Sequence, residues 1–243
     1  MLLHGLVGSG RFWGAAYDAA AADHRLIVPD LLGFGRSERP DRGYGPDDHV
    51  DAVIAALDEL GVREPVIIGA HSLGTVVALR FAARHPERVT NVTAFGPPLY
   101  RSVATAKVRI AAASPMARLF ALPGSVAERS CRWVCEHRDV AARAAQWTHP
   151  SLPPALAADA VQHTWSSYSE TMERCLLTAE PATWLEGLPI PVRFVAGTSD
   201  PVVDHDFIRQ LSGRWPETQV ETWTGDHSLP LSNPDRCLAT ILR

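Results

Sequence analysis

Short apolar runs separated by stretches with helical periodicity constrain the fold of this chain more than any other feature. The runs are rich in Val and Ile, are bounded by Gly or Pro, and occupy residues 25–30, 65–70, 89–96 and 191–197. Such runs are typical of buried strands in a parallel sheet, and we expect a further strand at 218–223. Strands that alternate with helices predict an α/β fold, with a mostly parallel sheet and helices on both faces.

The stretches between the runs carry helix signals. Residues 46–60 open with Pro46 and two acids, as a helix N-terminus favours, and Gly61 follows as a stop. Residues 73–85 have apolar residues at helical spacing and end before Pro86. We also expect a helix near 206–211 and another at the C-terminus.

The alternation of strands and helices stops after Gly96. From residue 97 to residue 186 the pattern predicts helices and proline breaks but no strand, and the segment holds four of the seven tryptophans (Trp133, Trp147, Trp165 and Trp184). We therefore expect a single α/β core, residues 1–96 and 187–243, with residues 97–186 inserted as a helical cap over one end of the sheet.

Charge and hydropathy exclude several classes of partner. The net charge is −4 and no basic stripe occurs, which argues against nucleic acid. No apolar run reaches the ~18 residues of a membrane span, and the first residues lack the features of a signal peptide. We expect a cytoplasmic protein that acts on a small molecule, away from the membrane. The sequence leaves the oligomeric state open.

Four cysteines are present, at positions 131, 135, 175 and 237. Cys131 and Cys135 would share one face of a helix, but only His137 lies near them in the sequence. Metal sites usually need more ligands at closer spacing. We therefore expect structural burial of these cysteines, no disulfide framework, no metal and no cofactor.

The stretch "AHSLG" places Ser72 directly between the expected strand at 65–70 and the helix at 73–85. Such a tight turn strains the serine backbone and raises its hydroxyl into a cleft, while small residues at positions 70 and 74 relieve the crowding. The usual pattern is G-x-S-x-G, so Ala70 is a departure. The pattern predicts a nucleophile; the alternative is a serine that caps the helix.

A serine nucleophile needs a histidine base and a carboxylate that orients it. Asp200 follows the expected strand at 191–197, and His227 follows the one at 218–223. Both positions lie at strand carboxyl ends, on the same rim as Ser72, and the order serine, acid, histidine fits this kind of fold. The alternatives are a turn that starts at Asp200 and a structural role for His227.

An oxyanion hole also requires backbone donors aimed at the attacked carbonyl. The N–H of Leu73 follows the nucleophile, and the loop "HGLVGSG" supplies the second donor, which we expect to be the N–H of Leu6. Gly5 would allow close approach of the backbone, and His4 would brace the loop. The alternative is a Gly-rich turn without this role.

These stretches, together with "VPDLLGFGRSERP", "FVAGTSDPVV" and "GDHSLP", resemble the α/β-hydrolase superfamily over nearly the whole chain, and the branch of small cap-bearing serine esterases in particular. The resemblance implies the α/β-hydrolase fold, Ser72, Asp200 and His227 as catalytic triad, and Leu6 and Leu73 as oxyanion donors. It also implies that Asp30 shapes a loop on the pocket side. Relatives with an aspartate nucleophile are disfavoured because position 72 is serine.

The beginning of the chain departs from that family. Members usually carry two more strands before the "HG" loop, whereas only three residues precede His4 here. We expect that upstream residues are missing, and that restoring them increases solubility.

The predicted reaction is hydrolysis of a carboxylic ester, thioester or lactone of a small hydrophobic substrate through an acyl-enzyme. Two alternatives stay open. A carbon–carbon bond hydrolase would use the same triad, although such relatives often carry asparagine where this chain has His71. A non-hydrolytic ligand receptor could also keep this fold.

Overall fold

The computed structural model describes residues 1–113, 117–118, 125–148 and 153–243. At its centre is a five-stranded parallel sheet with the strands in sequence order. The strands are β1 (Leu2–Leu3), β2 (Val66–His71), β3 (Val89–Phe95), β4 (Val192–Gly197) and β5 (Thr218–Trp223). The predicted α/β class and four of the five predicted strands are therefore confirmed.

The central strands β2, β3 and β4 are mostly apolar because both faces of the sheet are covered. Successive side chains of a strand point to opposite faces. Accordingly Phe194 and Ala196 of β4 pack in one hydrophobic core and Val195 packs in a second. A mostly apolar sequence is the consequence of this burial on both sides, and polar residues such as Thr90 and Arg193 lie near the start of a strand, where burial is incomplete.

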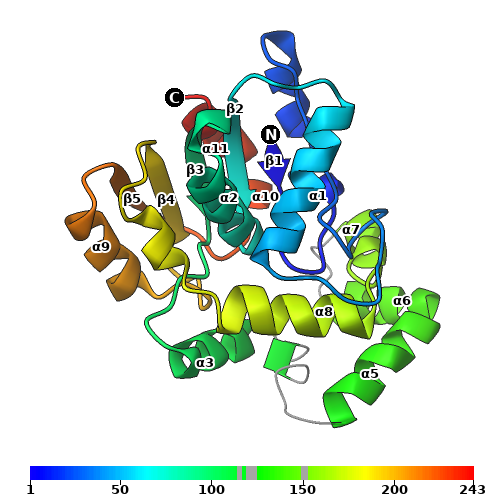
Figure 1. The fold of residues 1–243 in the computed structure, drawn as a ribbon. Coiled ribbons are helices and arrows are strands. Elements are labelled where there is room, and N and C mark those ends of the chain that lie inside the picture. Colours follow the sequence, from blue (N-terminus) through cyan, green and yellow to red (C-terminus); the bar gives the residue numbers. More distant parts are fainter. Residues whose placement is uncertain (114–116, 119–124, 149–152) are drawn as a thin grey trace.

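Helices form the two outer layers. The larger core contains apolar residues of α1 (Pro46–Glu59), α2 (Leu73–Arg84) and α9 (His205–Arg214). The smaller core contains residues of α11 (Pro234–Ile241) and of the 3-10 helix η2 (Ala15–Ala22). Figure 1 shows α1 and α2 in front of the sheet and α11 behind it. The remaining short helices of these layers are η1 (Gly10–Trp13), η3 (Pro86–Arg88) and α10 (Leu229–Ser232).

Local sequence explains where α1 begins and ends. Pro46 occupies the first turn, and the Asp48 carboxylate accepts a hydrogen bond from the Gly45 N–H at 2.7 Å. The helix stops before Gly61, whose φ of 68° suits glycine. Both ends agree with the signals in the sequence.

All regular elements that the structure describes between β3 and β4 are helical. They are α3 (Val103–Ala113), α5 (Ser125–Glu136), α6 (Arg138–Thr148), α7 (Pro154–Asp159), α8 (Trp165–Thr171), the π-helix η4 (Met172–Leu177) and the 3-10 helix η5 (Pro181–Leu185). Figure 1 shows α3, α5, α6, α7 and α8 together beyond one end of the sheet. The predicted cap also includes residues 114–116, 119–124 and 149–152, which lie outside the described residues.

The prediction of a strand at 25–30 is wrong. This segment forms no regular ladder, and Ile27 only accepts one hydrogen bond, from the Leu2 N–H at 2.8 Å. A ladder needs a partner strand of comparable length, and β1 has only two residues.

No helix in the described part of the chain combines the length and the apolar character that a membrane span requires.

Candidate active site

Ser72 lies at a strained turn between β2 and α2, with φ 50° and ψ −118°. Positive φ is costly for a residue with a side chain, by about 1–3 kcal/mol, and such strain concentrates at functional sites. Among the described residues only Val7, with φ 52°, shares this feature outside glycine. The Ser72 side chain makes no capping hydrogen bond to α2. This conformation therefore does not fit a simple helix cap.

Small residues make the turn possible, as the sequence predicts. A Cβ atom on Gly74 would lie 2.5 Å from the carbonyl oxygen of Leu3 and 2.9 Å from that of His4. Both contacts are with backbone, which has little freedom to move. Ala70, where the usual pattern has glycine, is fully buried and is accommodated between β1 and β3.

His227 and Asp200 meet on the loops after β5 and β4. The Nδ1 atom of His227 lies 2.8 Å from Oδ2 of Asp200, whose side chain is completely buried. Asp200 also accepts a hydrogen bond from the Val202 N–H at 2.8 Å. Burial alone would raise the pKa of Asp200, but the hydrogen bond and charge of His227 and the Val202 N–H outweigh it and lower that pKa. Asp200 is thus held as a carboxylate that orients His227.

Ser72 and His227 line the same cavity, so the three predicted side chains are brought to one site. Within the described residues the Ser72 hydroxyl forms no hydrogen bond.

Two residues that the sequence analysis did not assign to the site support His227. A Cβ atom on Gly96, at the end of β3, would lie 2.8 Å from Nδ1 of His227, so only glycine leaves room for the ring. His71 stacks on Phe12, with ring centroids 4.4 Å apart, and lies 4.8 Å from the His227 ring. Burial and the neighbouring His227 lower the pKa of His71 to about 3, so His71 is neutral. Gly96, which directly follows β3, is the signal in the sequence that could have indicated a close packing partner at this rim.

The loop after β1 lies against the turn that carries Ser72. His4 Nδ1 contacts the Gly5 carbonyl at 2.7 Å, and His4 Nε2 accepts the Leu31 N–H at 2.8 Å, so His4 braces this loop. A Cβ atom on Gly5 would lie 3.1 Å from Cβ of Ser72, which is why glycine is needed there. Burial lowers the pKa of His4 and keeps it neutral.

The two backbone N–H groups predicted as oxyanion donors, those of Leu6 and Leu73, have no hydrogen-bond partner among the described residues. No hydrogen bond within the described residues uses the N–H of Leu6. Leu73 is the first residue of α2, where a backbone N–H has no partner within the helix. Leu6 lines the same cavity as Ser72.

The cavity has a volume of about 460 Å³ and is formed jointly by the sheet loops and the helices between β3 and β4. Among the described residues that line it there is no Asp, Glu, Lys or Arg. Its apolar wall includes Tyr100, Ile110, Trp133, Val134, Tyr168 and Met172. The cavity therefore suits a neutral, apolar group.

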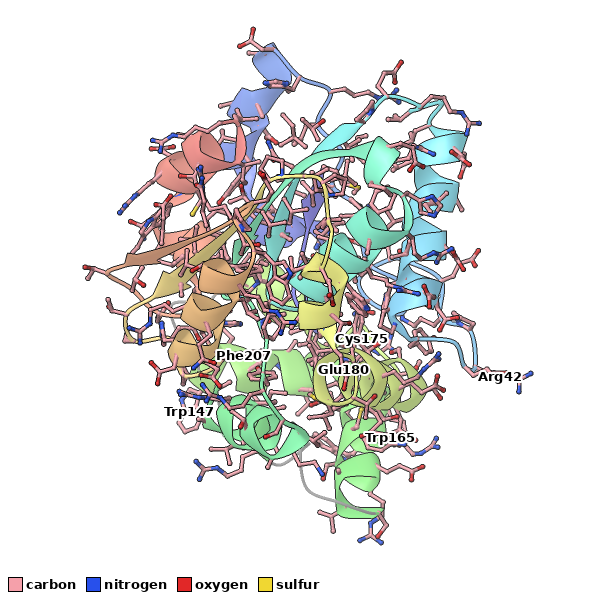
Figure 2. All side chains as sticks on the ribbon, turned by 60° about the vertical axis from the view of Figure 1, so that its left-hand side comes forward. Arg42, Trp147, Trp165, Cys175, Glu180 and Phe207 are labelled. Atoms are coloured by element: carbon pink, nitrogen blue, oxygen red, sulfur yellow. The ribbon has the colours of Figure 1, made fainter. Side chains whose placement is uncertain are left out.

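The tryptophans of the segment 97–186 contribute little to this wall. Among the described lining residues Trp133 is the only tryptophan. Trp147 is 83% exposed and lies at the edge of the molecule in Figure 2. Trp184 instead stacks beneath the guanidinium of Arg80, whose Cζ atom lies 5.3 Å from the centroid of the Trp184 ring.

Residues 1–234 match the family model of the alpha/beta hydrolase fold. A probable lysophospholipase of Arabidopsis thaliana, BODYGUARD 4, is 36% identical over 105 residues, which cover 42% of this chain and 25% of that protein. The 2-hydroxymuconate semialdehyde hydrolase of Pseudomonas sp. (strain CF600) is 39% identical over 100 residues, which cover 40% of this chain and 35% of that protein. The chain thus spans only about a quarter to a third of these curated relatives.

Solved structures resemble the chain over its whole length. An esterase from Rhodococcus sp. ECU1013 superposes with a TM-score of 0.74 and 24% identity, covering 99% of this chain and 87% of the esterase. At this level of identity the likeness supports the fold alone.

Proposed function

The chain belongs to the alpha/beta hydrolase family, and from that premise we propose that it is a serine hydrolase that cleaves a carboxylic ester, thioester or lactone through an acyl-enzyme. The observation that carries this proposal is the 2.8 Å contact between His227 Nδ1 and Asp200 Oδ2, at a cavity that also contains Ser72 on its strained turn. Ser72 is the nucleophile, His227 the base and Asp200 the residue that orients the base.

The geometry supports a defined sequence of proton transfers. Asp200 accepts the Nδ1 proton of His227, so the lone pair of Nε2 is free to take the proton of the Ser72 hydroxyl. The serine oxygen attacks the carbonyl carbon, and the oxygen of the tetrahedral intermediate accepts hydrogen bonds from the Leu6 and Leu73 N–H groups. His227 then protonates the leaving alcohol or thiol. Water, deprotonated by the same histidine, attacks the acyl-enzyme and releases the acid.

The cavity supports a small hydrophobic substrate. Residues 97–186 form a cap in this proposal, and they supply most of the apolar wall. A charged group in this cavity would meet no opposite charge among the described lining residues, and its desolvation would be costly. We therefore propose a neutral acyl or alcohol group of moderate size.

Hydrolysis of a carbon–carbon bond is the second candidate, and the similarity to 2-hydroxymuconate semialdehyde hydrolase favours it. The same three side chains would serve that reaction. An anionic substrate of that kind would, however, need cationic groups that the described lining residues do not offer. Ester hydrolysis is therefore the preferred proposal.

Labelling with a fluorophosphonate probe tests the nucleophile, and a substrate panel tests the reaction. We expect labelling of the wild type and of Ser212→Ala, a surface serine on α9, and none of Ser72→Ala. Turnover of p-nitrophenyl esters should follow the same pattern. Faster turnover of a vinylogous diketone acid would instead favour carbon–carbon cleavage, and labelling of a folded Ser72→Ala protein would end the proposal. Tight ligand binding without turnover, unaffected by Ser72→Ala, would point to a receptor.

A further inference from the structure

A cluster of metal-ligand side chains lies in the helical segment between β3 and β4. Cys131 and Cys135 come from successive turns of α5, and His163 comes from the link between α7 and α8. One ligand atom from each of the three lies within 4.8 Å of the other two. Within the described chain this is the one such group of three or more His, Cys, Asp or Glu side chains.

His163 is prepared to act as a ligand. Its Nδ1 lies 3.0 Å from the Ala160 carbonyl, and since a carbonyl only accepts, Nδ1 carries the proton. The lone pair is therefore on Nε2, which is buried and has no hydrogen-bond partner among the described residues. Metal-bound histidines are typically oriented in this way, with the other ring N–H donated to a carbonyl. The residue is only 2% exposed, so Nε2 is shielded from solvent.

The sulfurs of Cys131 and Cys135 lie within 4.8 Å of each other, and the guanidinium of Arg138 shares a hydrogen-bond acceptor with Cys135. Cys135 donates to the His163 carbonyl at 3.1 Å, and Arg138 donates to the same carbonyl at 3.2 Å. A cysteine binds a metal as the thiolate, so Zn²⁺ would displace the proton of each thiol, and the positive charge of Arg138 beside Cys135 would stabilise the resulting negative charge.

We propose that Cys131, Cys135 and His163 form a binding site for Zn²⁺, with a solvent molecule as the fourth ligand. Two thiolates and one neutral imidazole are the donors that this cation prefers, and the two sulfur charges neutralise it beside Arg138. Tetrahedral zinc separates such ligand atoms by about 3.5–3.8 Å, so the side chains must close by about 1 Å.

A metal bound at this site would connect two parts of the chain. It would link α5 to the segment before α8. Trp133 and Val134 of α5, Tyr168 of α8 and His163 itself line the cavity that contains Ser72. Zinc would thus hold two parts of the cavity wall together. The inference concerns binding and does not depend on the proposed hydrolase reaction.

Sequence reasoning missed this site because its third ligand is distant in the chain. His137, the histidine nearest to the cysteines, stacks on Trp133 with ring centroids 4.7 Å apart, and its Nδ1 lies 3.0 Å from the Trp133 carbonyl. It takes no part in the cluster. His163 is brought in by the packing of α7 and α8, which periodicity does not predict.

Titration of the reduced full chain with Co²⁺, followed by displacement with Zn²⁺, tests the proposal. We expect one equivalent of cobalt to give a thiolate charge-transfer band and the visible bands of a tetrahedral site, both abolished by zinc. Loss of a residue that only supports a ligand typically weakens metal binding 10–100-fold, and loss of a direct ligand should cost at least as much. We therefore expect Cys131→Ser combined with Cys135→Ser, or His163→Gln alone, to weaken cobalt and zinc binding by at least about 100-fold. The matched control, Cys175→Ser with Cys237→Ser, changes the other two cysteines and should bind like the wild type.

Two measurements on the wild type keep the test independent of how the variants fold. Zinc should raise the melting temperature, and it should protect Cys135 from iodoacetamide as followed by mass spectrometry. Absence of the charge-transfer band from the folded reduced wild type would overturn the proposal. So would an equal band in the folded Cys131→Ser, Cys135→Ser protein, or alkylation of Cys135 at the same rate with and without zinc.

Discussion

His71 donates its Nε2–H to the backbone carbonyl of His227 at 2.8 Å and thereby ties the residue before Ser72 to the loop that carries the second histidine. The carbonyl only accepts, so this bond sets the tautomer of His71 and leaves its Nδ1 without a proton. That atom is buried and has no partner among the described residues. His71 is accordingly a positioning residue, which acts on the site through the backbone of His227.

Removing this bond should lower the turnover number. We expect His71→Ala to reduce kcat by about 10–100-fold with little change in KM, because a displacement of about 1 Å near the reacting groups can cost 10²-fold. His71→Gln, whose amide nitrogen lies near the position of Nε2, should restore most of the rate. The check is steady-state kinetics with an ester substrate, with circular dichroism to verify folding. An unchanged kcat in folded His71→Ala would contradict the assignment.

Replacing the carboxylate that orients His227 should be far more damaging. Asp200→Asn keeps the size of the side chain but no longer favours the proton on Nδ1 of His227, and we expect kcat to fall by about 10⁴-fold. Asp206→Asn, which removes an exposed carboxylate of α9, serves as control and should keep full activity. A kcat of Asp200→Asn within tenfold of the wild-type kcat would argue against the role of Asp200.

Buried histidines should make the fold sensitive to acid. Burial lowers the pKa of His49 to about 4, of His71 to about 3 and of His163 to about 4. Below about pH 6.5 these histidines take up protons in the unfolded chain but stay neutral in the folded protein. Their contribution to the free energy of unfolding is therefore complete above that pH and is lost as the pH falls toward 4. Each of these histidines should lower the free energy of unfolding by up to about 1.4 kcal/mol for every pH unit by which the pH falls within this window.

Urea unfolding at several pH values between 7.5 and 4.5, with a chelator present, measures this slope. His49→Gln removes one of the three groups and should make the dependence shallower. A free energy of unfolding that stays constant from pH 7 to pH 5 would show that these side chains are protonated without cost.

The cavity wall should set the size of the acyl group. Ala141 of α6 lines the cavity and is 8% exposed, so Ala141→Phe would fill part of the space. We expect kcat/KM for long-chain p-nitrophenyl esters to fall by about 10–100-fold, with the acetate little affected, since each lost or added methylene is worth about 1–3 kcal/mol. Val140→Phe, at the neighbouring exposed position, is the control. Equal losses for short and long esters would argue against a role of Ala141 in acyl selection.

The packing of the nucleophile turn on β1 predicts a stability effect. Gly74→Ala should lower the free energy of unfolding by about 1–3 kcal/mol, because its methyl group would overlap the Leu3 carbonyl. Gly213 of α9 has nothing within 4 Å of its Cβ position, so Gly213→Ala should be neutral or stabilise by up to about 1 kcal/mol. Chemical denaturation of both variants tests the contrast. Equal free energies of unfolding for Gly74→Ala and Gly213→Ala would mean that the turn at Ser72 adjusts to the added methyl group without cost.

Sequence patterns predicted the strands β2, β3 and β4 because these strands are largely buried on both faces and read as apolar runs. The segment at 25–30 has the same composition, but its neighbour β1 is too short to pair with it. β5 is half-exposed at the edge of the sheet, and its prediction came from its place in the alternation of strands and helices. The positions of Ser72, Asp200 and His227 were predictable because each follows a strand of one parallel sheet. The cavity wall and the approach of His163 to the cysteines depend on how helices pack, and no local pattern encodes that.

The positive φ of Ser72 has an evolutionary consequence. A glycine at this position would relax the backbone, and most other residues would bear the same strain as serine without supplying a hydroxyl. A screen that rewards thermal tolerance alone would therefore drift toward glycine and discard the side chain. A serine at such a costly position is therefore expected where the hydroxyl has a chemical task that offsets the strain.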